Sequence, residues 1–150
     1  MPSPYTEEHA RSWIEQTIRD WERREGESAF AVTDGGEVVG AIGLRLLEDE
    51  YTARGSIGYW VAADARGHGV ATDALRIVSR WALRQLGLTR VELVTDPENR
   101  ASQRVAEKAG FRQEGLLRGY VQMRNGQRDC VMFSLLATEL EDGEGGKGRA

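Results

Sequence analysis

Two glycines in a short turn are the residues of this chain best suited to bind a phosphate. Gly67 and Gly69 stand between the apolar segment 57–62 and a helix expected over 71–86. Glycine has no Cβ, so the backbone there can bend sharply and approach a ligand closely. The first N–H groups of a helix have no partner within it, and the helix dipole makes that end partly positive. The turn is therefore predicted to cradle a phosphate, with a plain strand-to-helix connection as the alternative.

Three phosphate-binding patterns compete for this turn. A P-loop requires a lysine after its last glycine, and none lies nearby, so that pattern is excluded. The segment 67–72 follows the dinucleotide pattern GxGxxG, except that Thr72 stands where Gly or Ala belongs; Asp96 could mimic the ribose-binding acid of that pattern. The third pattern is RxxGxA, Arg66 to Ala71, which resembles the coenzyme A pyrophosphate loop of the GCN5-related N-acetyltransferases (GNAT superfamily). Only this last pattern uses Arg66.

A second block of residues resembles the same family. The segment 96–115 is similar to the NxxS and EKxGFxxEG signatures of the RimJ/RimL type of ribosomal-protein acetyltransferase. The family-like region runs from about Thr6 to Leu136, which is most of the chain. A dinucleotide enzyme needs none of this second block. The order and spacing of the motifs together favour the GNAT interpretation.

The resemblance implies a binding site for acetyl-CoA. Backbone N–H groups of residues 66–71, with Thr72 adjacent, would take the pyrophosphate, and the backbone of Trp60 and Val61 would pair with the pantetheine arm as a strand pairs with a sheet edge. The expected cofactor contacts are Trp60, Val61, Arg66, Gly67, His68, Gly69, Val70, Ala71, Thr72, Asn99 and Ser102. Arg66 has a solvated loop charge as its alternative, and Asn99 also stands where a helix N-cap belongs.

Acetyl transfer to an amine also needs a proton acceptor and a donor to the departing sulfur. Some GNAT enzymes use a tyrosine on the helix that corresponds to 100–109 as that donor; Ala106 lies near its place, so Ser102 is the nearest hydroxyl and the expected donor. Glu92, within the apolar strand 91–95, is the expected base, because burial would raise its pKa; a solvated residue on an exposed face is the alternative. Three further residues line the cleft or belong to the core: Tyr59, Tyr120 and Arg118.

The elements that must position these residues follow from the apolar periodicity and the turn signals. The expected elements are a helix over 7–25, strands over 28–33 and 38–47, a polar loop over 48–54, a strand over 56–62, helix 71–86, strand 91–95, helix 100–109, and strands over 111–123 and 129–137. This order predicts one α/β domain over 1–140, with a GNAT-like, mostly antiparallel mixed sheet, one parallel β-α-β crossover and helices on both faces. The Gly-rich, charged segment 141–150 is expected to be disordered.

Composition narrows the class of partner. A net charge of −4 gives no general affinity for nucleic acid, and no apolar run approaches the ~20 residues of a membrane span. Cys130 is the only cysteine, and His9 and His68 lie far apart, so neither a disulfide nor a metal site is expected. The N-terminal residues lack the basic and apolar regions of a secretion signal, so the cytoplasm is the expected location.

The GNAT family ordinarily begins with a further strand and helix, which are missing before the helix expected over 7–25. The strand 28–33 would then be a sheet edge, and Trp13, Ile14 and Trp21 would lose neighbours, so a homodimer is expected. The sequence thus predicts an acyl-CoA-dependent N-acetyltransferase in which a protein N-terminal or small-molecule primary amine attacks acetyl-CoA directly. The alternatives are a catalytically silent acyl-CoA-binding module and a nucleotide-dependent oxidoreductase.

Overall fold

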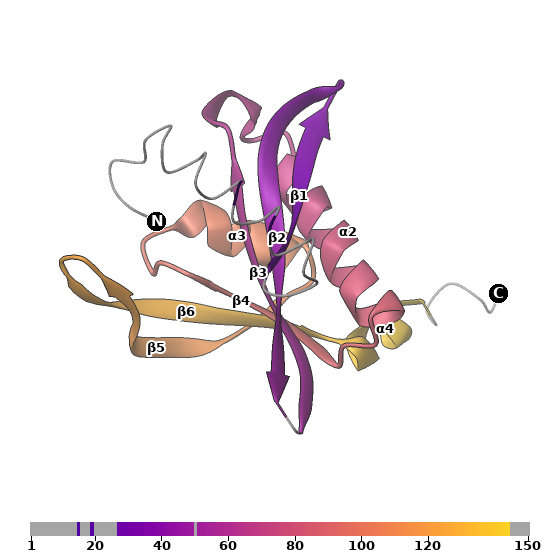
Figure 1. The fold of residues 1–150 in the computed structure, drawn as a ribbon, viewed down its shortest axis with the longest axis vertical. Helices are drawn as coiled ribbons and strands as arrows, with labels where there is room; N and C mark the ends of the chain where they lie inside the picture. Colours follow the sequence, from indigo (N-terminus) through magenta and orange to yellow (C-terminus); the bar gives the residue numbers. More distant parts are fainter. Residues whose placement is uncertain (1–14, 16–18, 20–26, 50, 145–150) are drawn as a thin grey trace.

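The computed structural model describes residues 15, 19, 27–49 and 51–144 (Figure 1). The expected helix 7–25 lies outside these residues, apart from Glu15 and Arg19, which are both helical. The described elements are, in chain order, β1 (Glu27–Asp34), β2 (Glu37–Asp49), β3 (Thr52–Val61), the short 3-10 helix η1 (Ala63–Ala65), α2 (Val70–Gln85), β4 (Arg90–Thr95), α3 (Arg100–Lys108), β5 (Arg112–Met123), β6 (Gly126–Leu136) and α4 (Ala137–Glu144).

The six described strands form one sheet in the order β1-β2-β3-β4-β6-β5. Strands β3 and β4 are parallel and are joined through α2, whereas the other four neighbouring pairs are antiparallel. This confirms the predicted mixed sheet with one parallel crossover. Figure 1 shows β1–β3 running nearly vertically and β5 and β6 nearly horizontally, so the sheet turns strongly where β3 meets β4.

One hydrophobic core lies between the sheet and the helices α2 and α3. Leu75 and Ala82 of α2 and Ala106 of α3 are fully buried, because apolar residues recur on one face of each helix. They pack on alternate residues of the strands, among them Ile42 and Phe133. This core holds α2, with the turn before it, against β3.

The structure differs from the predicted elements in two places. Most of the predicted polar loop 48–54 is strand, because β2 and β3 remain paired as far as Asp49 and Thr52. Further along the chain, the last strand begins three residues earlier than predicted, at Gly126, and ends at Leu136, where α4 begins. Helix α4 covers 141–144, the first four residues of the segment that was expected to be disordered.

Candidate functional site

A gap opens within the sheet between β3 and β4. The two strands pair at only three positions, of which Ser56 with Glu92 is the last. Beyond it, β3 stays paired with β2 as far as Val61, and β4 stays paired with β6 as far as Thr95. The facing edges of residues 57–61 and 93–95 therefore have no strand partner among the described residues. An extended chain could pair with such an edge, as an added strand does.

The glycine turn lies at the end of β3 and leads directly into α2. Gly67 and Gly69 adopt left-handed φ angles of 80° and 84°, which glycine reaches without steric cost. A Cβ at Gly67 would meet nothing within 4 Å, and one at Gly69 would meet only the end of the Asp73 side chain at 4.0 Å. Packing within the chain therefore does not require these glycines. They provide the bend and leave the outer side of the turn open.

Six successive N–H groups line this turn. In the described part of the chain, the N–H groups of residues 67–72 have no hydrogen-bond acceptor; the next one, of Asp73, bonds the carbonyl of Gly69 at 3.0 Å. Gly69 caps α2 without a side-chain hydrogen bond, so these donors are left for a ligand or for water. Thr72 is 7% exposed, so its side chain belongs to the core and its N–H is the group directed at the turn.

Arg66 has a local partner. Its Nε donates to the carbonyl oxygen of Val61 at 3.0 Å, which ties the turn to the end of β3. The alternative that Arg66 is only a solvated loop charge therefore leaves out this hydrogen bond to Val61. The bond places the guanidinium beside the strand end and the glycine turn.

The NxxS residues form the start of α3. The side chain of Asn99 accepts a hydrogen bond from the N–H of Ser102 at 3.0 Å, which makes Asn99 the N-cap of this helix. The preceding loop is also held, since Gln103 Nε2 donates to the carbonyl of Pro97 at 2.9 Å. This confirms the capping role expected of Asn99 and fixes Ser102 in the first turn of α3.

The contact of Tyr59 with Ser102 was not predicted from the sequence, which placed Tyr59 only in the cleft or the core. Its hydroxyl lies 2.9 Å from Ser102 Oγ, so a hydrogen bond joins β3 to the first turn of α3. Burial raises the pKa of the Tyr59 phenol, and the bond to Ser102 only partly opposes this. The two residues are 43 positions apart, and no local pattern connects them.

Glu92 is buried, with 6% exposure, and lies at the last paired position of β3 and β4. It faces away from the core side chains of Val91 and Leu93 but is buried there, so the alternative of a solvated residue on an exposed face is wrong. Its Oε2 accepts a hydrogen bond from Arg90 Nε at 2.9 Å, and Arg54 Nη1 lies 3.8 Å away. The carboxylate therefore has two cations beside it, instead of the apolar surroundings on which the prediction rested.

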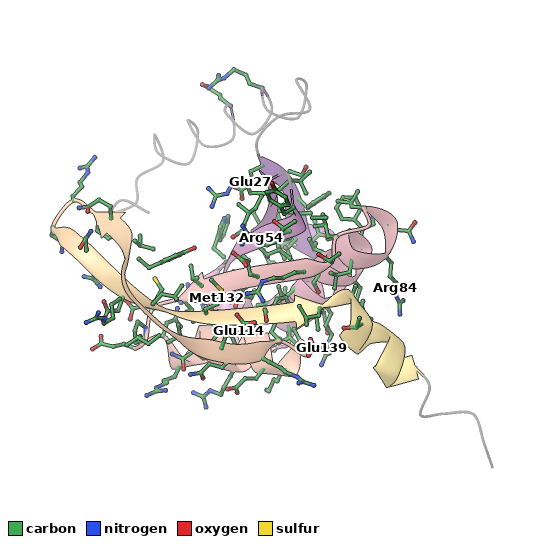
Figure 2. All side chains as sticks on the ribbon, turned by 90° about the horizontal axis from the view of Figure 1, so that it is seen from below. Glu27, Arg54, Arg84, Glu114, Met132 and Glu139 are labelled. Carbon is green, nitrogen blue, oxygen red and sulfur yellow. The ribbon has the colours of Figure 1, made fainter. Side chains whose placement is uncertain are left out.

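The ion pairs of Glu92 extend to β5 and β6. Arg90 makes two hydrogen bonds, of 2.7 and 2.8 Å, to Glu114, and Ser134 Oγ also bonds the Glu114 carboxylate. These bonds hold the pKa of Glu114 at about 2, below its ordinary 4.5, and the bonds to Glu114 raise the pKa of Arg90. Figure 2 labels Glu114 and Arg54 of this cluster. The cluster ties β3, β4, β5 and β6 together where β3 and β4 are still paired.

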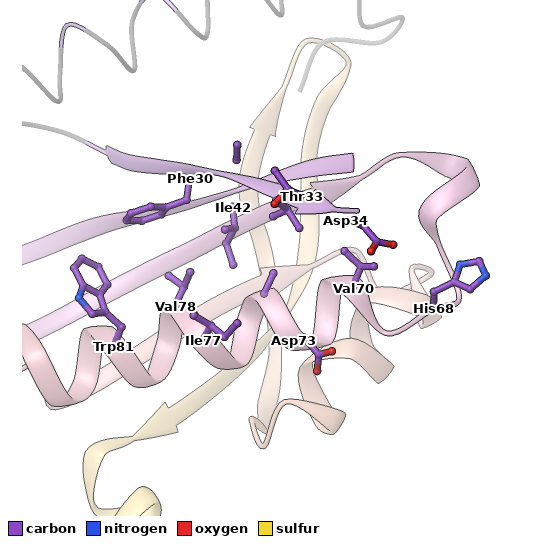
Figure 3. A pocket seen from close by; sticks show the side chains of 13 residues that line it. Phe30, Thr33, Asp34, Ile42, His68, Val70, Asp73, Ile77, Val78 and Trp81 are labelled. Carbon is purple, nitrogen blue, oxygen red and sulfur yellow. The ribbon is translucent and has the colours of Figure 1, made fainter. Parts of the chain in front are cut away.

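A separate groove of about 630 Å³ lies between β1 and α2. Figure 3 shows Phe30 of β1 facing Trp81 of α2, and the two rings meet edge to face with centroids 5.6 Å apart. His68 and Asp34 lie at the other end of the groove, next to the glycine turn (Figure 3). This hollow is on the β1 side of α2, not between β3 and β4.

The described residues give little support for a metal site or for a reactive thiol. Within 27–49 and 51–144, no three His, Cys, Asp or Glu side chains gather where they could hold a metal ion. Burial, and to a lesser extent Asp96 and Asp129, raise the pKa of the Cys130 thiol, which disfavours the thiolate that a nucleophile needs. No helix among the described residues is long and apolar enough to cross a membrane.

Comparison with known proteins identifies the family. The model of the acetyltransferase (GNAT) domain matches residues 1–112, about three quarters of the chain. The protein belongs to the GNAT acetyltransferases. Among its GNAT relatives, "Putative ribosomal N-acetyltransferase YdaF" of Bacillus subtilis (strain 168) is 34% identical over 136 residues, which cover 88% of this chain and 73% of the relative. "Uncharacterized N-acetyltransferase p20" of Bacillus licheniformis is 32% identical, over 91% of this chain and 78% of the relative.

Solved GNAT structures support the same assignment. RimJ of Mycobacterium smegmatis, in complex with CoA-disulfide, matches with a TM-score of 0.80 and 30% identity, over 93% of this chain and 70% of that one. The protein is thus an acyl-CoA-dependent N-acetyltransferase similar to the RimJ/RimL type. The alternative of a nucleotide-dependent oxidoreductase is not supported.

Proposed function

We propose that acetyl-CoA is the acetyl donor and that it lies in the gap between β3 and β4. The observation that carries the proposal is that the separated strand edges and the six open N–H groups lie at one end of β3. The N–H groups of residues 67–72 receive the pyrophosphate, with Arg66 beside them as a further cation. The backbone of Trp60 and Val61 pairs with the pantetheine arm. Asn99 and Ser102 lie at the sulfur end.

The reaction is a direct attack in a ternary complex. The amine lone pair adds to the acetyl carbonyl carbon, the C–S bond breaks, and its electron pair stays on the CoA sulfur, where Ser102 donates a hydrogen bond. The amine loses one proton, so the products are an amide and the CoA thiol. We assign Glu92 as the proton acceptor, since it lies where the gap begins. This assignment requires that Glu92→Gln lower kcat.

The acceptor is a primary amine, and we propose a protein N-terminal amine ahead of a small-molecule amine. The similarity to RimJ and to a relative named for ribosomal acetylation supports this order. The net charge of −4 gives no support to nucleic acid as a partner.

Two measurements test the donor and the acceptor. Acetyl-CoA and CoA, but not NAD, are expected to raise the melting temperature. Thiol release should then appear with peptides that have a free N-terminus, or with small primary amines if the preference is reversed. Stabilisation by CoA without thiol release from any amine would favour the silent CoA-binding module.

We further propose a homodimer formed through β1 and the groove beside it. Among the described residues β1 ends the sheet, so its outer edge can pair with another strand. The groove contributes apolar surface, since Ile77 is 69% and Trp81 37% exposed. A second copy brings the same strand and the same groove, which together form a self-complementary interface. Sedimentation of the wild-type chain measures this directly.

A further inference from the structure

The Tyr59–Ser102 pair is the one hydroxyl–hydroxyl contact between β3 and α3 among the described residues. Its two oxygens are 2.9 Å apart, and either of them could donate. The Tyr59 hydroxyl also lies 3.4 Å from the backbone carbonyl of Ser102, a long distance for a hydrogen bond. The Ser102 hydroxyl is therefore the stronger partner of Tyr59.

Tyr59 is held firmly in place. It follows Gly58 on the part of β3 that has left β4, and its ring packs against the hydrophobic core that includes Ile57 and Leu75. Because burial raises the pKa of its phenol, Tyr59 keeps its proton at neutral pH and above. The packed ring holds the phenol oxygen in place, and its protonated hydroxyl can donate to Ser102 Oγ. Ser102, half-buried in the first turn of α3, is the group whose hydroxyl can turn.

The bond restricts where Ser102 can send its own proton. When Tyr59 donates to Ser102 Oγ, one lone pair of that oxygen is used, and the Ser102 proton is left to point at a group in the gap. Chained hydrogen bonds also strengthen one another, so the Ser102 proton becomes a better donor.

We propose that Tyr59 is a positioning residue, which aims the Ser102 hydroxyl at the sulfur of bound CoA by donating to Ser102 Oγ. The inference rests on the proposed function, in which the sulfur end of the cofactor lies at Ser102. No proton leaves Tyr59: the thiolate that departs from the acetyl group is stabilised by the Ser102 hydrogen bond, and the net proton it gains comes from the amine. Tyr59 therefore acts through Ser102.

The pKa of the CoA thiol bound to the protein tests this without acetyl transfer. The thiolate absorbs in the ultraviolet, and the same titration of CoA-free protein removes the contribution of Cys130. A hydrogen bond to the thiolate should place the wild-type value about one unit below that of free CoA. Tyr59→Phe keeps the ring and should return the thiol pKa toward the free value, as should Ser102→Ala. The double variant should go no further than either single one.

Turnover provides the second measurement. Tyr59→Phe should lower kcat about tenfold and leave the KM for acetyl-CoA unchanged, because the lost interaction acts on the departing sulfur. Tyr51→Phe is the matched control: Tyr51 is 87% exposed in the turn before β3, so it should keep the wild-type titration and kcat. If Tyr59→Phe does not fold, Ser102→Ala and Ser102→Thr test the same bond from the other side, and only the threonine should keep the lowered thiol pKa.

The outcomes distinguish a failure of this inference from a failure of the proposed function. If wild-type protein fails to bind CoA, the proposed function and the inference are both contradicted. If CoA binds and Tyr59→Phe keeps the wild-type thiol pKa, the inference alone is wrong. Additive effects of the two single variants in the double variant would likewise show that Tyr59 does not act through Ser102.

Discussion

At the scale of single residues, the glycine turn carries the proposed contact with the pyrophosphate. Gly69→Val should weaken acetyl-CoA binding at least tenfold, because a branched side chain covers the N–H groups. The substitution also has a conformational cost, since a φ of 84° is unfavourable for any residue with a Cβ, by about 1–2 kcal/mol. Calorimetric titration with acetyl-CoA measures the affinity, and thermal melting measures the lost stability.

Gly36→Val separates these two effects. Gly36 lies in the turn between β1 and β2 at a φ of 89°, and a Cβ there would also meet nothing within 4 Å. It therefore carries comparable strain at a position that supplies none of the N–H groups of residues 67–72. Gly36→Val should lose similar stability and keep its affinity for acetyl-CoA. Equal affinity for acetyl-CoA in the Gly36 and Gly69 variants would show that the glycine turn is not part of the cofactor site.

Asn99 allows the capping role to be separated from the cofactor contact. Asn99→Asp keeps the oxygen that accepts the Ser102 N–H, so α3 should remain capped, but it removes the amide donor and adds a negative charge. This variant should melt within a degree or two of wild type and bind CoA more weakly. Asn99→Ala should lose about 1 kcal/mol of stability as well. Unchanged CoA affinity in Asn99→Asp would leave Asn99 as a cap alone.

At the scale of elements, the cluster around Arg90 joins β4, β5 and β6. The Glu114 pKa of about 2 lies below its ordinary 4.5, so Glu114 stabilises the fold fully above pH 4.5 and this contribution is lost as the pH falls toward 2. Its side chain is 43% exposed, so solvent screening limits the contribution to at most about 1 kcal/mol.

Glu114→Gln tests that contribution. Its melting temperature should lie below that of wild type at pH 6, and the difference should shrink as the pH approaches 2. Glu37→Gln is the control, because Glu37 is exposed and has no ion pair among the described residues. A difference in melting temperature between wild type and Glu114→Gln that stays constant from pH 6 to pH 2 would show that the charge of Glu114 does not stabilise the fold.

The sequence predicted the elements well wherever local signals exist. The apolar face of α2, the glycines around it and the Asn-Gly turn before β6 each depend on neighbouring residues. The end of β6 was not predicted: α4 starts with a local cap, in which Glu139 accepts the N–H of Leu136 at 2.9 Å, and with an ion pair from Glu139 to Arg112 of β5 that no local pattern shows. The pairing of β2 with β3 over the polar segment 48–54 was also missed. It is made by backbone hydrogen bonds, which leave no pattern in the side chains.

The parts of the site that lie within a few consecutive residues could be predicted from the sequence. The turn and the cap of α3 could be found from motifs a few residues long. The contacts of Glu92 with Arg54, of Arg90 with Glu114 and of Ser102 with Tyr59 could not, because each joins different elements and depends on the register of the sheet. The early separation of β3 from β4 likewise has no local signal.

At the scale of the whole molecule, the groove between β1 and α2 predicts the oligomeric state. Ile77→Lys places a charge in the groove at a position that is already 69% exposed, so it should leave the fold intact and dissociate the dimer. Leu116→Lys is the control, because Leu116 is 55% exposed on β5, at the opposite end of the sheet. Sedimentation at micromolar concentration should give dimers for wild type and Leu116→Lys, and monomers for Ile77→Lys. A monomeric wild-type protein that acetylates amines would contradict the dimer.

The central claim is that the chain transfers an acetyl group from acetyl-CoA directly to an amine. The most direct measurement incubates the protein with acetyl-CoA and a peptide that has a free N-terminus and no lysine, and counts both products in one reaction. One CoA thiol should be released for each acetylated peptide detected by mass spectrometry, and a peptide with a blocked N-terminus should release almost none. Equal thiol release with both peptides, or none with any primary amine, would contradict the claim.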